Sequence, residues 1–258
     1  MTNQSTLFIG TAFALISGIT YIYIGWWLGR RVVPSGDARL AWQAFTIWWF
    51  ALAGTTLLGA FQNLLGALGH TELPLFVTAQ YVNTLVACIA LWGLVYYLIY
   101  LFTGNSRALV PLSIFYAIYY VLLVYYYTAS VPNNVEIGRW HTTLVYQNSL
   151  TGPFFVILVF LLLSPQIIGS FAYFTLYFRV SDVTQKYRVL LVSWGIIFWF
   201  SSPLIGLAGG ITAQDWWQLA SRVISLGTSL VILMAYLPPR WIKKRYGIIS
   251  LNDESLRA

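Results

Sequence analysis

One polar stripe near the carboxyl end of the chain has the residue types needed to bind a ligand. Asp215, Gln218, Arg222, Ser225 and Ser229 are spaced by three or four residues, so a helix presents them on one face. A guanidinium at the centre of a membrane helix costs about 2.5 to 3.5 kcal/mol on an insertion scale and needs a partner or water. The stripe therefore indicates either binding of an anionic or carbonyl group or a structural polar network.

Arg222 is the only charged residue within the long apolar segments of the chain. Asp215 lies seven residues earlier, roughly 10 Å along a helix axis, so direct pairing requires a bend or a bridging group. Two other segments supply polar groups at a similar depth: Thr55, Gly59, Gln62 and Gly66, and then Gln80, Asn83 and Thr84. These groups either converge with Arg222 or hydrogen-bond between packed helices, at about 0.6 kcal/mol per bond on average.

Most enzyme chemistry is disfavoured by the scarcity of ionisable residues. The chain has seven Asp plus Glu, two His and one Cys. His70 and His141 lack ligand-like spacing, so we expect no metal site. Cys88 has no partner for an intrachain disulfide. We expect no enzyme, and a small transporter is the weakest alternative because no intramembrane carboxylate or histidine is available for proton transfer.

The composition places these residues in a membrane protein. Of 258 residues, 59% are hydrophobic and only 8% are charged, whereas a soluble domain carries roughly a quarter charged residues. Seven segments have the length and apolar character of a span: 5–28, 40–65, 73–101, 108–127, 152–178, 189–208 and 216–237. We therefore predict an all-α, polytopic seven-transmembrane-helix bundle in the plasma membrane.

Basic residues alternate between the connections and predict the orientation. One side collects Arg30, Arg31, Arg39, Arg107, Arg179, Lys186, Arg188 and the tail from Arg240, and the other holds only Arg139. Because basic loops remain cytoplasmic, the amino terminus is expected outside and the carboxyl terminus inside. This gives a transmembrane domain over 1–240 and a basic cytoplasmic tail over 241–258. The net charge of +7 then indicates contact with anionic lipid, and no nucleic-acid partner is expected.

The outer connection 128–149 is long enough to have a role of its own. Asn133 and Asn134 predict a turn, and the β-prone run Thr142 to Tyr146 follows. We expect either a small hairpin that forms a lid over the mouth of the bundle or a passive loop.

Aromatic residues fall into two groups. Pairs such as Trp26 with Trp27 and Trp48 with Trp49 lie near expected helix ends, where we predict an interfacial belt. Deeper rings either pack in the core or line a pocket for an apolar or conjugated molecule: Trp92, Tyr116, Tyr119, Tyr120, Trp194 and Trp199.

Several short motifs resemble the seven-helix sensor region of bacterial and archaeal sensory histidine kinases. They are Phe102 to Gly104, His141 in the long outer segment, Gln185 to Leu191, and Leu237 to Trp241. The resemblance implies a ligand sensor. Because the 258 residues contain no kinase or phosphoacceptor domain, we expect any output to pass through a separate protein partner.

The chain also resembles microbial rhodopsins, through Gly10 to Ala12 and through Trp199 four residues before Pro203. That family holds retinal on a lysine of its last helix, and this sequence has no lysine between Lys186 and Lys243. Arg222 cannot replace it, because a guanidinium does not form the imine and stays charged. We therefore expect no covalent retinal, while a noncovalent isoprenoid, quinone or carotenoid stays open.

The sequence thus favours a receptor-like membrane module that requires no cofactor, contacts membrane lipid, and acts with a protein partner in the membrane or at its cytoplasmic face. Its expected ligand site combines Arg222, Asp215, Gln218, Gln62, Asn83, Trp199 and His141. The alternative is a structural or cofactor-holding subunit of a larger membrane complex.

Overall fold

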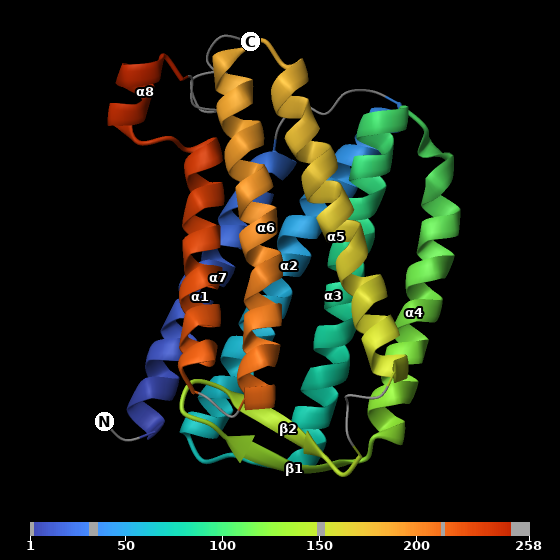
Figure 1. Ribbon diagram of the computed structural model, residues 1–258, viewed down its shortest axis with the longest axis vertical. Coiled ribbons are helices and arrows are strands. Elements are labelled where there is room, and N and C mark those ends of the chain that lie inside the picture. Colours follow the sequence, from blue (N-terminus) through green and yellow to red (C-terminus); the bar gives the residue numbers. More distant parts are fainter. Residues whose placement is uncertain (1–2, 31–35, 149–152, 213–214, 249–258) are drawn as a thin grey trace.

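The computed structural model describes residues 3–30, 36–148, 153–212 and 215–248 of the chain, which is mostly helical (Figure 1). The helices are α1 (Asn3–Gly29), α2 (Asp37–Ala67), α3 (Leu73–Thr103), the 3-10 turn η1 (Ser106–Ala108), α4 (Leu109–Ala129), α5 (Pro153–Arg179), α6 (Val183–Thr212), α7 (Asp215–Tyr236) and α8 (Arg240–Tyr246). The two strands are β1 (Pro132–Ile137) and β2 (Thr142–Tyr146). The predicted all-α class is confirmed, and each predicted apolar segment coincides with one long helix.

Helix α6 begins earlier than its apolar segment, at Val183 instead of residue 189. The physical reason is a polar first turn with a side-chain cap. A carboxylate oxygen of Asp182 accepts a hydrogen bond from the backbone N–H of Gln185 at 2.7 Å, which satisfies one of the open donors at a helix start. A prediction from hydropathy detects only the apolar part of a helix, so it places the start of this helix after its polar first turn.

Five helices in the described part of the chain are long and apolar enough to cross a membrane. They are Ser5–Gly29, Asp37–Ala67, Leu73–Thr103, Ser106–Ala129 and Leu219–Tyr236. Large apolar side chains also point outward, such as Val110 on α4, which is 64% exposed, and Phe178 on α5, which is 73% exposed. A soluble monomer rarely exposes so much apolar surface. The helices and their surface support a multi-pass membrane protein.

The core is built around α2, between α1 and α3. Trp48 and Trp49 are fully buried there, beside Tyr21 and Phe45. The expected position of this tryptophan pair in an interfacial belt is therefore wrong, because both rings face neighbouring helices. Close helix approach explains the burial: a Cβ on Gly93 of α3 would lie 2.6 Å from the carbonyl oxygen of Ala44, as is usual where small residues sit between membrane helices.

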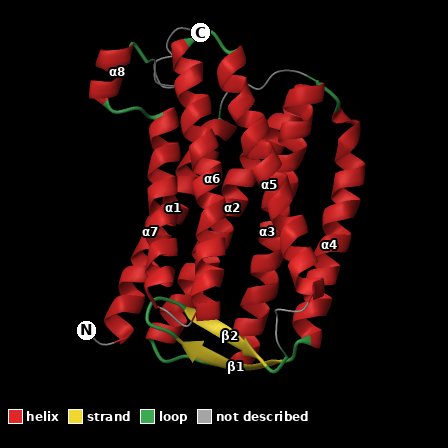
Figure 2. Cartoon of the chain, viewed as in Figure 1, coloured by secondary structure: helices red, strands yellow, loops and turns green. Residues whose placement is uncertain are grey.

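Strands β1 and β2 form an antiparallel hairpin across one end of the helices (Figures 1 and 2). The predicted strand over Thr142 to Tyr146 is confirmed. The predicted turn at Asn133 and Asn134 is wrong, because both residues lie in β1, where the register shifts between Pro132 and Asn134. The chain reverses after Ile137 instead, and the Gly138 N–H donates to the His141 carbonyl at 3.0 Å.

Candidate functional site

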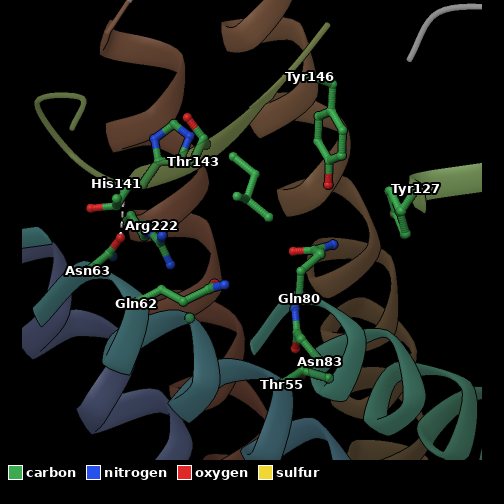
Figure 3. A pocket seen from close by; sticks show the side chains of 13 residues that line it. Thr55, Gln62, Asn63, Gln80, Asn83, Tyr127, His141, Thr143, Tyr146 and Arg222 are labelled. Carbon is green, nitrogen blue, oxygen red and sulfur yellow. Dashed lines mark hydrogen bonds between the residues drawn. The ribbon is translucent and has the colours of Figure 1, made fainter. Parts of the chain in front are cut away.

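A polar cavity of about 400 Å³ lies beneath the hairpin. It is lined by α2, α3, the end of α4, the second half of the hairpin and α7 (Figure 3). The lining residues are Thr55, Gly59, Gln62, Asn63, Gln80, Asn83, Tyr127, His141, Thr142, Thr143, Leu144, Tyr146 and Arg222. Its volume falls within the range of small-molecule sites.

The structure brings together four of the residues that the sequence selected. Arg222, Gln62, Asn83 and His141 all line this cavity. Trp199 does not, because it packs against the buried apolar cluster around α2. The side chains of Asp215 and Gln218 lie outside the described residues.

Sequence reasoning did not select Asn63 or the side chains of strand β2 that line the cavity. Asn63 follows Gln62 directly and is 1% exposed, so two adjacent amides in an apolar helix were the available signal. Thr142, Thr143 and Tyr146 belong to a strand whose neighbours in space a linear pattern does not reveal.

Helices α1 and α2 hold the hairpin in place over the cavity. The Asn63 Oδ1 atom accepts the backbone N–H of Thr142 at 2.9 Å, and the Thr6 hydroxyl donates to the carbonyl oxygen of Arg139 at 2.5 Å. Two glycines permit this approach. A Cβ on Gly10 would lie 2.8 Å from the Trp140 carbonyl oxygen, and one on Gly66 would collide with the Thr142 side chain. The roof of the cavity is thus attached to α1 and to α2, and α2 also lines the cavity.

The cavity carries an uncompensated positive charge among the residues that the structure describes. Arg222 is half-buried on α7, and no described carboxylate lines the cavity with it. Nor does Arg222 form a hydrogen bond or ion pair with any described residue. Two other described acidic groups have partners of their own. Glu72 pairs with His70 at 3.3 Å, and Asp37, at the start of α2 and 18 residues before the first cavity-lining residue of that helix, accepts the Ser106 hydroxyl at 2.6 Å. Such a guanidinium attracts an anion.

Three buried polar atoms around the cavity lack a hydrogen-bond partner in the described part of the chain. They are Asn63 Nδ2, Asn83 Oδ1 and Thr142 Oγ1. Leaving a buried polar atom unsatisfied costs about 1 to 3 kcal/mol, and buried polar groups in native proteins are nearly always paired with protein, water or ligand. The cavity is therefore chemically suited to a polar guest.

Two tyrosines form an aromatic wall at the edge of the cavity. The rings of Tyr127 and Tyr146 are stacked with their centroids 6.0 Å apart. Burial raises the pKa of the Tyr146 hydroxyl above its ordinary value of 10.0, so this side chain stays neutral at physiological pH. The wall adds flat apolar surface and a neutral hydroxyl, and no second charge.

Metal binding has no support among the described residues, where no group of three or more His, Cys, Asp or Glu side chains comes together. Comparisons with protein-family models, with curated proteins and with solved structures find no match. The polar cavity is therefore the feature of the chain that bears on its function.

Proposed function

We propose that this protein is a receptor-like seven-helix membrane module that binds a small ligand beneath the hairpin and signals through a separate protein partner. The observation that carries the proposal is Arg222: its guanidinium lines a roofed cavity together with Gln62 and Asn83 and has no counterion among the described residues. Even a partly buried charge is stabilised by a partner, and an anionic or polar guest would supply that partner to Arg222. In this proposal α5 and α6 also cross the membrane.

The distribution of basic residues supports an orientation with the hairpin outside. Helix α8 lies at the opposite end of the molecule from the hairpin (Figure 1), and its last turn contains Lys243, Lys244 and Arg245. Basic segments stay cytoplasmic and attract anionic lipid. A ligand then enters from outside, while α8 faces the cytoplasm and offers a basic surface to a partner.

Helix α7 provides the connection between the two ends. Arg222 lies near its start, and the helix continues to Tyr236, just before Pro238, Pro239 and α8. It packs closely on α6, where a Cβ on Gly195 would collide with the Ile232 side chain. A ligand that contacts α7 together with α2, α3 and the hairpin would shift α7 relative to them. Tight packing favours discrete rearrangements over gradual deformation.

A second function, as a cofactor-holding subunit of a membrane complex, is favoured by a different observation. An apolar groove of about 370 Å³ runs between α3 and α4 and is lined by Leu85, Cys88, Ile89, Trp92, Ser113, Tyr116, Ala117, Tyr120 and Val121. Trp92, Tyr116 and Tyr120 are among the deep aromatic residues that the sequence singled out. A quinone or another isoprenoid has the apolar surface to fit there.

The proposal is tested by gentle extraction of the Arg222→Gln variant and mass spectrometry of the small molecules and proteins retained. We expect the variant to fold and to retain about one tenth or less of the small molecule that the wild type retains. The reason is that a charge-assisted hydrogen bond contributes about 1.5 to 3 kcal/mol. Arg139→Gln is the matched control, since Arg139 is an exposed arginine of the same hairpin. Equal retention by the wild type and the Arg222→Gln variant would overturn the proposal.

A further inference from the structure

The polar cavity has two chemically different sides. Figure 3 places Arg222, Asn63 and His141 toward one side and Gln80, Asn83, Tyr127 and Tyr146 toward the other. The first side is rich in hydrogen-bond donors. The Oδ1 atom of the Asn63 amide accepts the Thr142 N–H at 2.9 Å, and this bond orients the amide. The other polar atom of the amide, the donor Nδ2, has no partner among the described residues.

The donors on this side match a carboxylate. A guanidinium presents N–H groups in a planar fork that fits the two oxygens of a carboxylate. The Asn63 Nδ2 atom and the Thr142 hydroxyl add donors that have no partner among the described residues. Arg222 is the single Lys or Arg that lines the cavity in the described part of the chain. One guanidinium matches a guest with one negative charge better than a guest with two.

The other side contains an acceptor. The Oδ1 atom of Asn83 is buried and has no hydrogen-bond partner among the described residues, so it is complemented by an O–H or N–H on the guest. The stacked rings of Tyr127 and Tyr146, 6.0 Å apart between centroids, give this side a flat apolar surface. A guest that reaches both sides therefore needs a donor placed away from its acid group.

We infer that the ligand is a small hydroxylated organic carboxylate, whose carboxylate binds Arg222 and Asn63 and whose hydroxyl donates to Asn83. This inference deepens the proposed function and rests on it. It distinguishes the ligand from a hydroxyl-free acid, which leaves Asn83 unpaired, and from a neutral alcohol or amide, which leaves Arg222 without an anion. It also distinguishes the ligand from a phosphate, free or on a lipid headgroup, whose second charge finds no second cation among the described lining residues.

The test measures thermal unfolding of the purified full chain in detergent with two matched series of probes. The first is 4-hydroxybenzoate, benzoate and 4-hydroxybenzamide, and the second is 6-hydroxyhexanoate, hexanoate and 6-hydroxyhexanamide, so the hydroxyl of each hydroxy acid is placed away from its carboxylate. Inorganic phosphate is tested as a further probe at the same ionic strength. We expect a hydroxy acid of at least one series to bind about tenfold or more tightly than its hydroxyl-free and neutral analogues, since buried groups left unpaired discriminate strongly.

Two variants assign the two ends of the ligand. Arg222→Gln is expected to abolish the preference for the acid over its amide, and Asn83→Ala to abolish the preference for the hydroxy acid over the hydroxyl-free acid. The controls are Arg139→Gln and Asn133→Ala, which change exposed residues of the hairpin. Each preference should be unchanged in its control.

The inference is overturned if neither hydroxy acid stabilises the wild type, if hydroxyl-free acids bind equally well, or if phosphate binds as tightly. In each case the proposed function still stands if wild type retains a small molecule that the Arg222→Gln variant releases. If both proteins retain it equally, the proposed function fails as well. A preference for phosphate would be followed by vesicles with and without anionic phospholipid, which separate a headgroup from a free anion.

Discussion

The cavity beneath the hairpin and the groove between α3 and α4 have similar volumes, about 400 Å³ and about 370 Å³, but opposite chemistry. Helix α3 contributes to both. Gln80 and Asn83 face the cavity, and Leu85, Cys88 and Trp92 face the groove. One helix thus serves two environments, because residues two positions apart point to different sides. The comparison shows that polar groups are collected under a roof, whereas the lipid-facing groove is almost entirely apolar.

The largest effect is expected from placing a charge in the groove. Cys88→Arg puts a guanidinium where the described lining offers no carboxylate, at a cost of about 2.5 to 3.5 kcal/mol on an insertion scale. We expect loss of folded protein, measured by size-exclusion chromatography and thermal unfolding in detergent. Cys88→Ala, which keeps the site small and apolar, is the control. If Cys88→Arg unfolds at the same temperature as that control, the groove tolerates a charge as well as the cavity does. That result would contradict the chemical difference between the two sites.

The roof of the cavity is tested by Gly66→Ala. The new Cβ collides with the Thr142 side chain, and overpacking typically costs about 1 to 3 kcal/mol. We expect a lower unfolding temperature and faster proteolysis of the hairpin. Gly59→Ala is the matched control, because it lies on the same helix and its Cβ would meet nothing within 4 Å. Equal stability of the two variants would show that the hairpin does not depend on close contact with α2.

A smaller effect is expected from removing one hydrogen bond at the cavity and one at the groove. Asn63→Leu removes the acceptor of the Thr142 N–H, and an unsatisfied buried donor costs about 1 to 3 kcal/mol. Ser113→Ala removes the acceptor of Trp92 Nε1, 3.1 Å away in the exposed groove, where about 0.6 kcal/mol is expected. Hydrogen exchange of the Thr142 amide should accelerate in the first variant alone. A larger loss of stability in Ser113→Ala would reverse this ranking.

The smallest effect concerns the exposed pair His70 and Glu72 at the start of α3. The pKa of Glu72 is lowered from 4.5 by a hydrogen bond from its own backbone N–H and then by His70. A carboxyl whose pKa is lower in the folded state stabilises the fold above the unfolded value, and that contribution is lost as the pH falls through the folded value. Glu72→Gln should therefore destabilise slightly at neutral pH and converge with wild type in acid. Parallel pH profiles of unfolding temperature would contradict this prediction.

Much of the fold was predictable because the membrane imposes simple rules. Long apolar runs in a bilayer must be helical, since every backbone group needs an internal partner, and each predicted segment is a long helix. The strand Thr142–Tyr146 was predictable from its β-branched residues. The turn was not, because pairing across the hairpin placed Asn133 and Asn134 within β1 and left the reversal to the residues around Gly138.

The candidate site was predictable in part. The isolated charge of Arg222 and the amides of Gln62 and Asn83 were visible as polar groups in apolar segments, and the structure places them around one cavity. Trp199 was selected for its depth, but its direction depends on how α6 packs, and it joins the apolar cluster. Asn63 was missed because its main contact lies 79 residues away along the chain, at Thr142.

The amino-acid sequence by itself determined which segments are helical and which polar side chains must be sheltered from lipid, because both follow from the local transfer of side chains and backbone out of water. Only the tertiary structure decided which of those side chains meet. Helix packing buried Trp48 and Trp49 in the core, and the hairpin docked on Gly10, Asn63 and Gly66 to close a cavity over Arg222. Such contacts depend on the relative rotation and spacing of several helices, which no local pattern specifies.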